Sequence, residues 1–414
     1  MKALRAIALC AAVFTTAPSA PGLGVRLRAQ ATNPQRLEEK AGPTARQLGE
    51  PQVTNFKEAA PSALIDWTAC STTGEIYASM SGVTPRGGLV VMPSPPSMPV
   101  VGISLADQRV TRYVPESLGP YPLPLRKAFN VGPHGGLYEL FDAYRHPLDR
   151  QNGVRPVPVI LRFDRDGSVS SRITLTGFGH ESLNSQMFGV FGDGSFLVTG
   201  ILSPTATKGG KPPVFVPRSS APHGARPAVP RPITAIFDQH GNFVVSADLA
   251  EPRRLARGPS TSPTLSASPA PGSLYFGPSM ATLQSLMVSS PDGGIYLLRP
   301  ASPAELYLIS SDGRVLRRVR LETPKGAGEP TDMSMMGSSA LFVAFSGLRK
   351  DGKGKFHVTT LLAAFDPSTW RLNQTYLPPP GNWLVPACAE GPDKILFFGS
   401  SKDNKLEVVS FSAT

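Results

Sequence analysis

The chain has 414 residues, a mass of 43.9 kDa and a formal net charge of +11 at pH 7. Its 44 Pro and 40 Gly make up about 20% of the chain, against an ordinary share of roughly 12%, and both residues interrupt helix interiors. A helical protein is therefore disfavoured. The hydrophobic share of 41% allows a large core and excludes wholesale disorder, while the charged share of 17% disfavours a coiled coil.

The first 31 residues have the features of a secretory signal peptide. Lys2 and Arg5 precede nine apolar residues at 6–14, too few to span a bilayer, which needs about 20. Cleavage after Ala20 or after Ala31 would fit, and loss of residues 1–31 would lower the net charge to +7. Since no later apolar stretch reaches membrane-spanning length, we expect an exported monomer, periplasmic or extracellular, without a transmembrane segment.

A short turn followed by an apolar or aromatic strand recurs six times. Another half-apolar segment precedes each copy, as at 66–70 and 284–288. Asp-Gly and Gly-Gly favour the positive φ of two-residue turns, so each copy predicts an inner hairpin. The copies lie at 74–77, 135–138, 193–197, 292–296, 339–342 and 393–396.

A second motif alternates with the first and predicts outer hairpins. It has an apolar alternation, an Asp, a polar turn and a further alternation, at 160–169, 235–244, 306–315 and 362–371, with a weaker copy at 103–110. Only one strand, at 406–411, follows the last inner hairpin. The count is therefore five complete four-stranded units and a sixth that lacks one strand.

This deficit predicts an all-β fold, a six-bladed β-propeller with four-stranded blades, over 63–414. In such rings a strand from one terminus completes the blade begun by the other, and here residues 52–57, within an N-terminal segment 32–62, are the natural donor. The alternative is a β-sandwich with appended hairpins. One interval between repeats is long because it contains two Pro/Arg/Ser-rich stretches, 205–231 and 251–280, which we interpret as insertions within one blade.

These stretches carry much of the positive charge, but no aromatic residues interleave with their arginines to stack on bases, so we expect no nucleic acid partner. Residues 238–247 resemble the core of NHL-type repeats, with Ala247 where the family has Asp. Residues 290–296 resemble the Pro-Asp-Gly turn of TolB-like repeats. Both families contain six-bladed propellers, so the resemblance implies the same fold for 63–414 and is silent on function.

Two cysteines remain once the signal segment is removed. Cys70 lies six residues before Ile76, and Cys388 lies seven before Ile395, so both fall at a similar height on the inner strands of the first and last blades. We predict a disulfide between them that holds the ring closed. The alternative is two buried free thiols, because inner strands of adjacent blades can lie beyond the ~7 Å limit between Cα atoms.

The excess loop length falls on one side of the predicted ring, which we call the loop-rich face. The residues that begin the inner strands should surround the channel entrance there, and two histidines project from the same face. The candidate ligand-binding residues are Asp66, Lys127, Asn130, His146, His180, Glu181, Gln186, Gln284, Asp332, Asn382 and Trp383. No catalytic or zinc-binding motif accompanies them, so no catalytic residue, metal or cofactor is predicted.

The sequence favours an exported binding propeller without catalytic machinery, whose protein, peptide or glycan partner binds the loop-rich face. An enzyme is the alternative, either a polysaccharide-acting lyase or a metal-dependent lactonase-like hydrolase. Lactonase-type propellers hold a divalent cation with Glu, Asn and Asp side chains. Similarity to them would assign this role to Asp66, Asn130, Glu181 and Asp332.

Overall fold

The computed structural model describes residues 45–56, 63–71, 74–82, 99–115, 123–146, 156–179, 181–204, 231–247, 249, 285–300, 304–325, 327–336, 340–350, 356–377, 385–389, 394–400 and 406–412. The signal segment 1–31 lies outside these residues, as do the insertions 205–231 and 251–280 except Arg231. All regular elements among the described residues are strands. None of these residues belongs to a helix that could cross a membrane.

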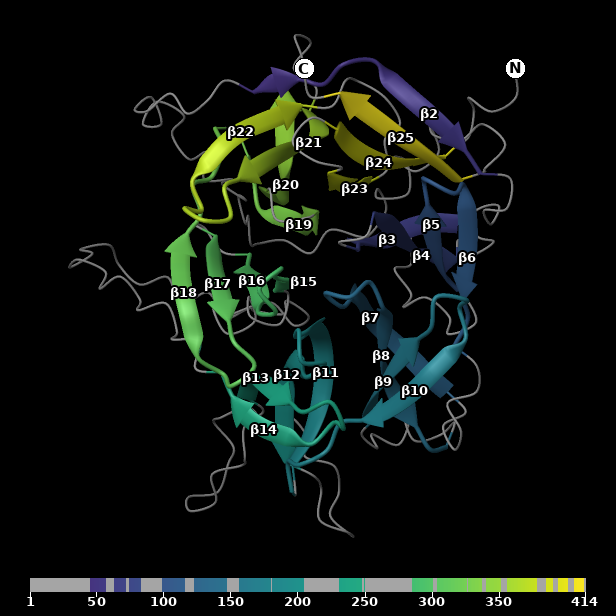
Figure 1. Ribbon diagram of the computed structural model, residues 1–414. Helices are drawn as coiled ribbons and strands as arrows, with labels where there is room; N and C mark the ends of the chain where they lie inside the picture. Colours follow the sequence, from purple (N-terminus) through teal and green to yellow (C-terminus); the bar gives the residue numbers. More distant parts are fainter. Residues whose placement is uncertain are drawn as a thin grey trace, which may run out of the picture. The chain divides into compact units, whose positions relative to one another are not determined.

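The strands form six sheets, which Figure 1 shows side by side around a common centre within Gly42–Thr414. Blade 1 has β3 (Ala63–Cys70), β4 (Glu75–Gly82), β5 (Val100–Ser104) and β6 (Arg109–Tyr113). Blade 2 has β7 (Leu123–Val131), β8 (Leu137–Tyr144), β9 (Val157–Phe163) and β10 (Val169–Thr174). Blade 3 has β11 (Glu181–Val190), β12 (Phe196–Pro204), β13 (Arg231–Phe237) and β14 (Phe243–Ser246).

Blade 4 has β15 (Leu286–Ser289), β16 (Ile295–Arg299), β17 (Glu305–Ile309) and β18 (Val315–Arg320). Blade 5 has β19 (Pro330–Met336), β20 (Ala340–Lys350), β21 (Phe356–Phe365) and β22 (Leu372–Leu377). Blade 6 has β23 (Val385–Ala389), β24 (Lys394–Ser400) and β25 (Leu406–Ser412), and its fourth strand is β2 (Pro51–Asn55). The predicted six-bladed propeller is confirmed, and the β-sandwich alternative is wrong.

The ring closes through the N-terminal strand, as the strand count predicts. β2 pairs antiparallel with β25, and Val53 lies opposite Val409. A second N-terminal strand, β1 (Arg46–Gln47), pairs parallel with β22 and adds a fifth strand to blade 5. The sequence analysis did not predict β1, because two residues are too few to show a periodic pattern.

The hydrophobic core lies between neighbouring blades. The middle strands are buried on both sides, so β16 has five buried residues in succession, whereas the outer strand β18 alternates between half-buried and exposed residues. One cluster joins Ile76 and Val101 of blade 1 to Leu396 and Phe398 of blade 6. Sheets that pack face to face around a closed ring produce this pattern, because neighbouring blades cover the middle strands while the outermost strand borders water.

The short hairpin turns are one residue longer than the sequence motif predicts. In blade 1 the Ser71 amide donates to the Glu75 carbonyl over 2.9 Å, and the Gly74 amide donates to the Ser71 carbonyl over 3.3 Å. Gly74 has φ of +88°, so the turn has three residues with glycine in the left-handed last position. The preference for glycine is therefore confirmed, but the two-residue turn is wrong.

The disulfide between Cys70 of β3 and Cys388 of β23 is present. Its Cα atoms are 6.1 Å apart, within the range that a disulfide can span, and 318 residues separate the cysteines in sequence. The bond links the inner strands of blades 1 and 6, next to the closure made by β2. The alternative of two free thiols is therefore wrong.

Candidate functional site

A β-bulge interrupts most inner strands near the loop-rich face. In β3, β7 and β11 the pairing skips one residue, and the skipped residues are Asp66, Lys127 and Gln186. Each lies ten residues before the first core residue of the next strand, the offset that identified it in the sequence. A residue released from the ladder can be re-aimed, which is a reason for bulges to occur beside binding sites. The structure describes the backbone of Asp66 but not its side chain.

In blades 5 and 6 the bulges do not fall at the predicted ligand-binding residues. In β19 the skipped residue is Thr331, and Asp332 pairs normally with Ala344. In β23 the skipped residue is Ala387. Asp332 thus lies one residue farther along its strand than the bulge positions of blades 1 to 3. Asn382 and Trp383 lie outside the described residues.

Lys127 and Gln186 belong to one polar network between blades 2 and 3. The Lys127 Nζ atom is 3.0 Å from Asp142 Oδ2 and 3.4 Å from Asn184 Oδ1. Gln186 donates to the same Asn184 oxygen over 3.0 Å, and Ser185 donates to Asp142 over 2.7 Å. We call these five residues the Lys127 network. Burial raises the pKa of Asp142, while Lys127 and Ser185 act in the opposite direction.

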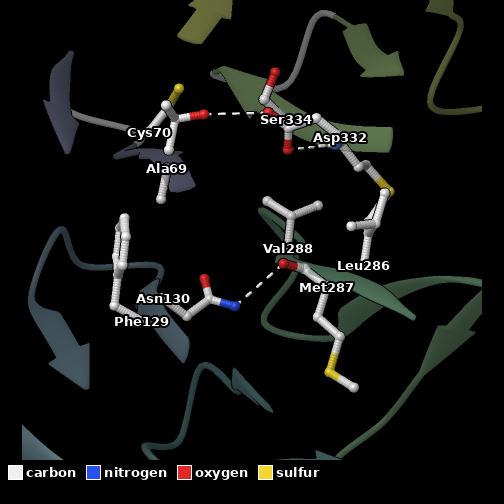
Figure 2. A pocket seen from close by; sticks show the side chains of 11 residues that line it. Ala69, Cys70, Phe129, Asn130, Leu286, Met287, Val288, Asp332 and Ser334 are labelled. Atoms are coloured by element: carbon white, nitrogen blue, oxygen red, sulfur yellow. Dashed lines mark hydrogen bonds between the residues drawn. The ribbon is translucent and has the colours of Figure 1, made fainter. Parts of the chain in front are cut away.

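Asn130 uses its amide to hold three blades together. Its Nδ2 atom donates to the carbonyls of Phe188 in blade 3 (2.8 Å) and Met287 in blade 4 (3.1 Å), and Figure 2 shows the side chain turned toward Met287. Its Oδ1 atom accepts the amide of Val131 over 2.7 Å. Ser289 of blade 4 makes a similar link, with its Oγ atom 2.7 Å from the carbonyl of Val190.

Asn130 and Asp332 line opposite sides of a small central cavity. Asp332 also links blade 5 to blade 1. Thr68 donates to its Oδ2 atom over 3.1 Å, and the amide of Met333 donates to its Oδ1 atom over 2.8 Å. The enclosing strands desolvate the carboxyl group and raise its pKa to about 7. The cavity has a volume of about 30 Å³ and is lined by Thr68, Asn130, Asp332 and neighbouring inner-strand residues (Figure 2). That volume holds one or two water molecules, since one water needs about 10–15 Å³.

The side chains of Asn130 and Asp332 do not aim their oxygen atoms at a common point, as ligands of one divalent cation would. Three or more oxygen ligands would have to converge on one point. Instead, the Asn130 oxygen accepts a backbone amide, and Asp332 faces Thr68 across the cavity. Within the described ranges, no group of three His, Cys, Asp or Glu side chains could hold a metal ion.

Two further candidates, Glu181 and His146, lie at strand ends on the loop-rich face. Glu181 begins β11 and forms an ion pair of 2.9 Å with Arg231, the first residue of β13. His146 is exposed just after β8. His180 and Gln284 lie outside the described residues.

Thr68, Asp142 and Asn184 were not selected from the sequence. Thr68 and Asp142 are polar residues inside strand segments that are otherwise rich in apolar residues, which is the signal that could have found them, whereas the segment around Asn184 is largely polar. Thr68 and Asp142 are buried at 7% and 2% exposure. Buried polar side chains need hydrogen-bond partners, so their positions predict contacts between blades.

Comparisons with known proteins found only distant likenesses among solved structures. No protein-family model and no curated protein sequence matches the chain. Among solved structures, a gluconolactonase from Xanthomonas campestris has 15% identity, covering 88% of this chain and 91% of that one, with a TM-score of 0.42. A protein of unknown function from Dyadobacter fermentans has 9% identity, covering 88% and 98%, with a TM-score of 0.46. Another of unknown function, from Bacteroides caccae, has 12% identity, covering 79% and 94%, with a TM-score of 0.39.

Likenesses this distant do not extend to function. The assignment of the chain as a six-bladed β-propeller rests on its own six sheets and on the strand β2 that closes the ring.

Proposed function

We propose that the protein is an exported, non-enzymatic binding propeller that holds a protein, peptide or glycan at the loop-rich end of its channel. The bulges of β3, β7 and β11 support this proposal, because they release Asp66, Lys127 and Gln186 from the ladder at equivalent positions. Binding residues are commonly carried by loops and strand ends on a rigid scaffold. Here the scaffold is rigid because hydrogen bonds that Asn130 donates and Asp332 accepts join its blades.

The Lys127 network has the chemistry of a polar contact surface. It offers an ammonium group, a side-chain amide and an exposed amide oxygen next to one another, while buried Asp142 holds the ammonium group in place. These groups can both donate and accept hydrogen bonds, as recognition of a glycan or of a peptide backbone requires.

The test is a screen of the immobilised protein against glycan and peptide libraries, followed by affinity measurements. The double variant Lys127→Ala/Gln186→Ala should weaken binding of a selected ligand by about tenfold or more, because it removes two polar contacts. The control Asp312→Ala/Arg314→Ala removes an exposed ion pair from a turn on the opposite face. Equal affinities of wild type and both variants, or a screen without ligands, would contradict the proposal.

The second candidate function is a lactonase-like hydrolase. The observation that favours it is Asp332, a carboxyl group with a pKa of about 7 that lies across the central cavity from Asn130. The solved structure from Xanthomonas campestris, described as a gluconolactonase, suggests gluconolactone as the first substrate to assay. Hydrolysis that requires a divalent cation and is lost in Asp332→Asn would support the enzyme, whereas hydrolysis at the uncatalysed rate with every cation would reject it.

A further inference from the structure

A larger cavity lies on the face opposite the loop-rich face, between the short turns of blades 2 and 3. Its volume is about 240 Å³, and it is lined by residues 132–134, 136, 138 and 162–165 of blade 2 and by Val190, Phe191 and Gly194 of blade 3. The central cavity has about 30 Å³ and different lining residues. The proposal that follows therefore does not depend on the proposed function.

In blade 1 a carboxylate of the protein itself occupies the equivalent position. Its turn glycine, Gly74, is followed by Glu75, and the Glu75 carboxylate lies against Tyr77 of β4. The Tyr77 hydroxyl is 2.7 Å from Glu75 Oε2 and 3.2 Å from the carbonyl of Gly135 in blade 2. Arg109 lies 3.5 Å from the other carboxylate oxygen. A phenol and a guanidinium thus hold a carboxylate that belongs to the protein.

Blade 2 repeats this arrangement without the carboxylate. Gly135 corresponds to Gly74, with φ of +80° against +88°, and Tyr138 corresponds to Tyr77. Gly136 stands where blade 1 has Glu75, so no side chain enters the space. Tyr138 is 8% exposed, and its hydroxyl makes no hydrogen bond within the described part of the chain, so it is open to a ligand in the cavity that it lines.

The cation in blade 2 comes from the neighbouring strand. Arg162 of β9 lies directly opposite Tyr138, and its guanidinium carbon is 5.9 Å from the centre of the Tyr138 ring. No carboxylate within the described ranges forms an ion pair with Arg162. Arg165 and Asp164 also line the cavity, as does His134, so the two arginines outnumber the one acidic residue.

We propose that this cavity binds a small organic carboxylate, whose charged group takes the place that Glu75 occupies in blade 1. The carboxylate accepts hydrogen bonds from Tyr138 and Arg162, and the apolar part of the ligand packs against Pro133 and Phe191. Charge-assisted hydrogen bonds of this kind are stronger than neutral ones. The cavity is smaller than the roughly 300–1,000 Å³ typical of drug-sized ligands, which restricts the ligand to a compact molecule.

The test measures binding of benzoate to the full chain by calorimetry, with benzamide as the uncharged ligand of the same shape. We expect saturable binding of benzoate and at least tenfold weaker binding of benzamide. Arg162→Gln should weaken benzoate binding by about tenfold, because it removes a charged donor. Arg314→Gln, which changes an exposed arginine in the turn between β17 and β18 of blade 4, should leave benzoate binding unchanged.

Gly136→Glu gives a second, independent test, because it builds the carboxylate of blade 1 into blade 2. A Cβ atom on Gly136 would meet only a Tyr138 ring carbon, at 3.6 Å, and Gly136 is not among the glycines with positive φ. The variant should therefore fold and lose benzoate binding. No binding of benzoate to the wild type, equal binding of benzamide, or benzoate binding that survives both Arg162→Gln and Gly136→Glu would overturn the proposal.

Discussion

Asn130 carries two of the hydrogen bonds that hold the centre of the propeller together. It donates to backbone carbonyls of blades 3 and 4 and accepts a backbone amide of its own blade, so its amide nitrogen and its oxygen both bond to protein. A buried polar group that loses its partner costs about 1–3 kcal/mol. The residue therefore contributes to the stability of the ring as a whole.

The variant Asn130→Ala should lower the free energy of unfolding by about 2 kcal/mol, because it leaves buried backbone groups without a partner. Urea denaturation of wild type and variant measures the difference. Gln186→Ala is the matched control, because its hydrogen bond is at the exposed side of the network and its loss should change stability by less than about 0.5 kcal/mol. An equal effect of the two substitutions would contradict the role of Asn130.

Asp332 makes stability depend on pH. Its pKa is about 7 in the folded chain, against about 3.9 in an unfolded one, so the folded state binds more protons between these values. The free energy of unfolding should therefore fall as the pH rises from about 4 to 7 and level off above, by an amount on the order of 4 kcal/mol.

The Asp332→Asn variant should flatten this decline, and urea denaturation at a series of pH values measures it. Burial also raises the pKa of Glu139 to about 7, although Arg126 at 2.9 Å opposes the shift. Glu139 is present in both proteins, so the comparison isolates Asp332. A variant whose stability declines as steeply as that of wild type would show that Asp332 does not titrate in this range.

At the scale of strands, the closing element β2 is anchored by the residue that follows it. Phe56 is 4% exposed and packs in the cluster that joins blades 1 and 6, with Ile76 and Phe398. Val53, in the middle of β2, is 47% exposed. The strand is therefore held by its ladder with β25 and by one buried aromatic side chain.

Phe56→Ala should lower the free energy of unfolding by about 3–4 kcal/mol, because it leaves a cavity where the ring closes. Val53→Ala should cost less than about 1 kcal/mol, because its side chain is half exposed and it keeps the backbone ladder. Thermal or urea unfolding of both variants measures the contrast. A Phe56→Ala protein as stable as Val53→Ala would contradict the anchoring role.

The strands could be predicted from the sequence because each blade repeats the same turn chemistry and apolar alternation. Side-chain roles at the centre could not be predicted in the same way. An offset of ten residues before the first core residue of the next strand selected Asp66, Lys127 and Gln186, which lie at bulges. The same offset in blade 5 points to Thr331, so Asp332 does not lie at the bulge of its strand. The partner of Asp332 is Thr68, which is 264 residues away in sequence. Local patterns carry no information about such a contact.

At the scale of the whole molecule, one closed ring explains the strand deficit, the N-terminal pairing and the disulfide. The same closure lets β2 and β25 share one ladder and brings Cys70 next to Cys388. The sequence predicted the disulfide because repeat position fixes the height of a residue on its strand. It did not exclude the alternative of two free thiols, because the distance between adjacent inner strands depends on how the blades pack.

The most direct test of ring closure is a peptide map of the purified protein, digested without reduction and analysed by mass spectrometry. The account predicts one pair of peptides joined through Cys70 and Cys388 that separates on reduction, because closure places these cysteines on adjacent inner strands. Recovery of both cysteines as free thiols from denatured, unreduced protein, or of either one linked to Cys10, would contradict it.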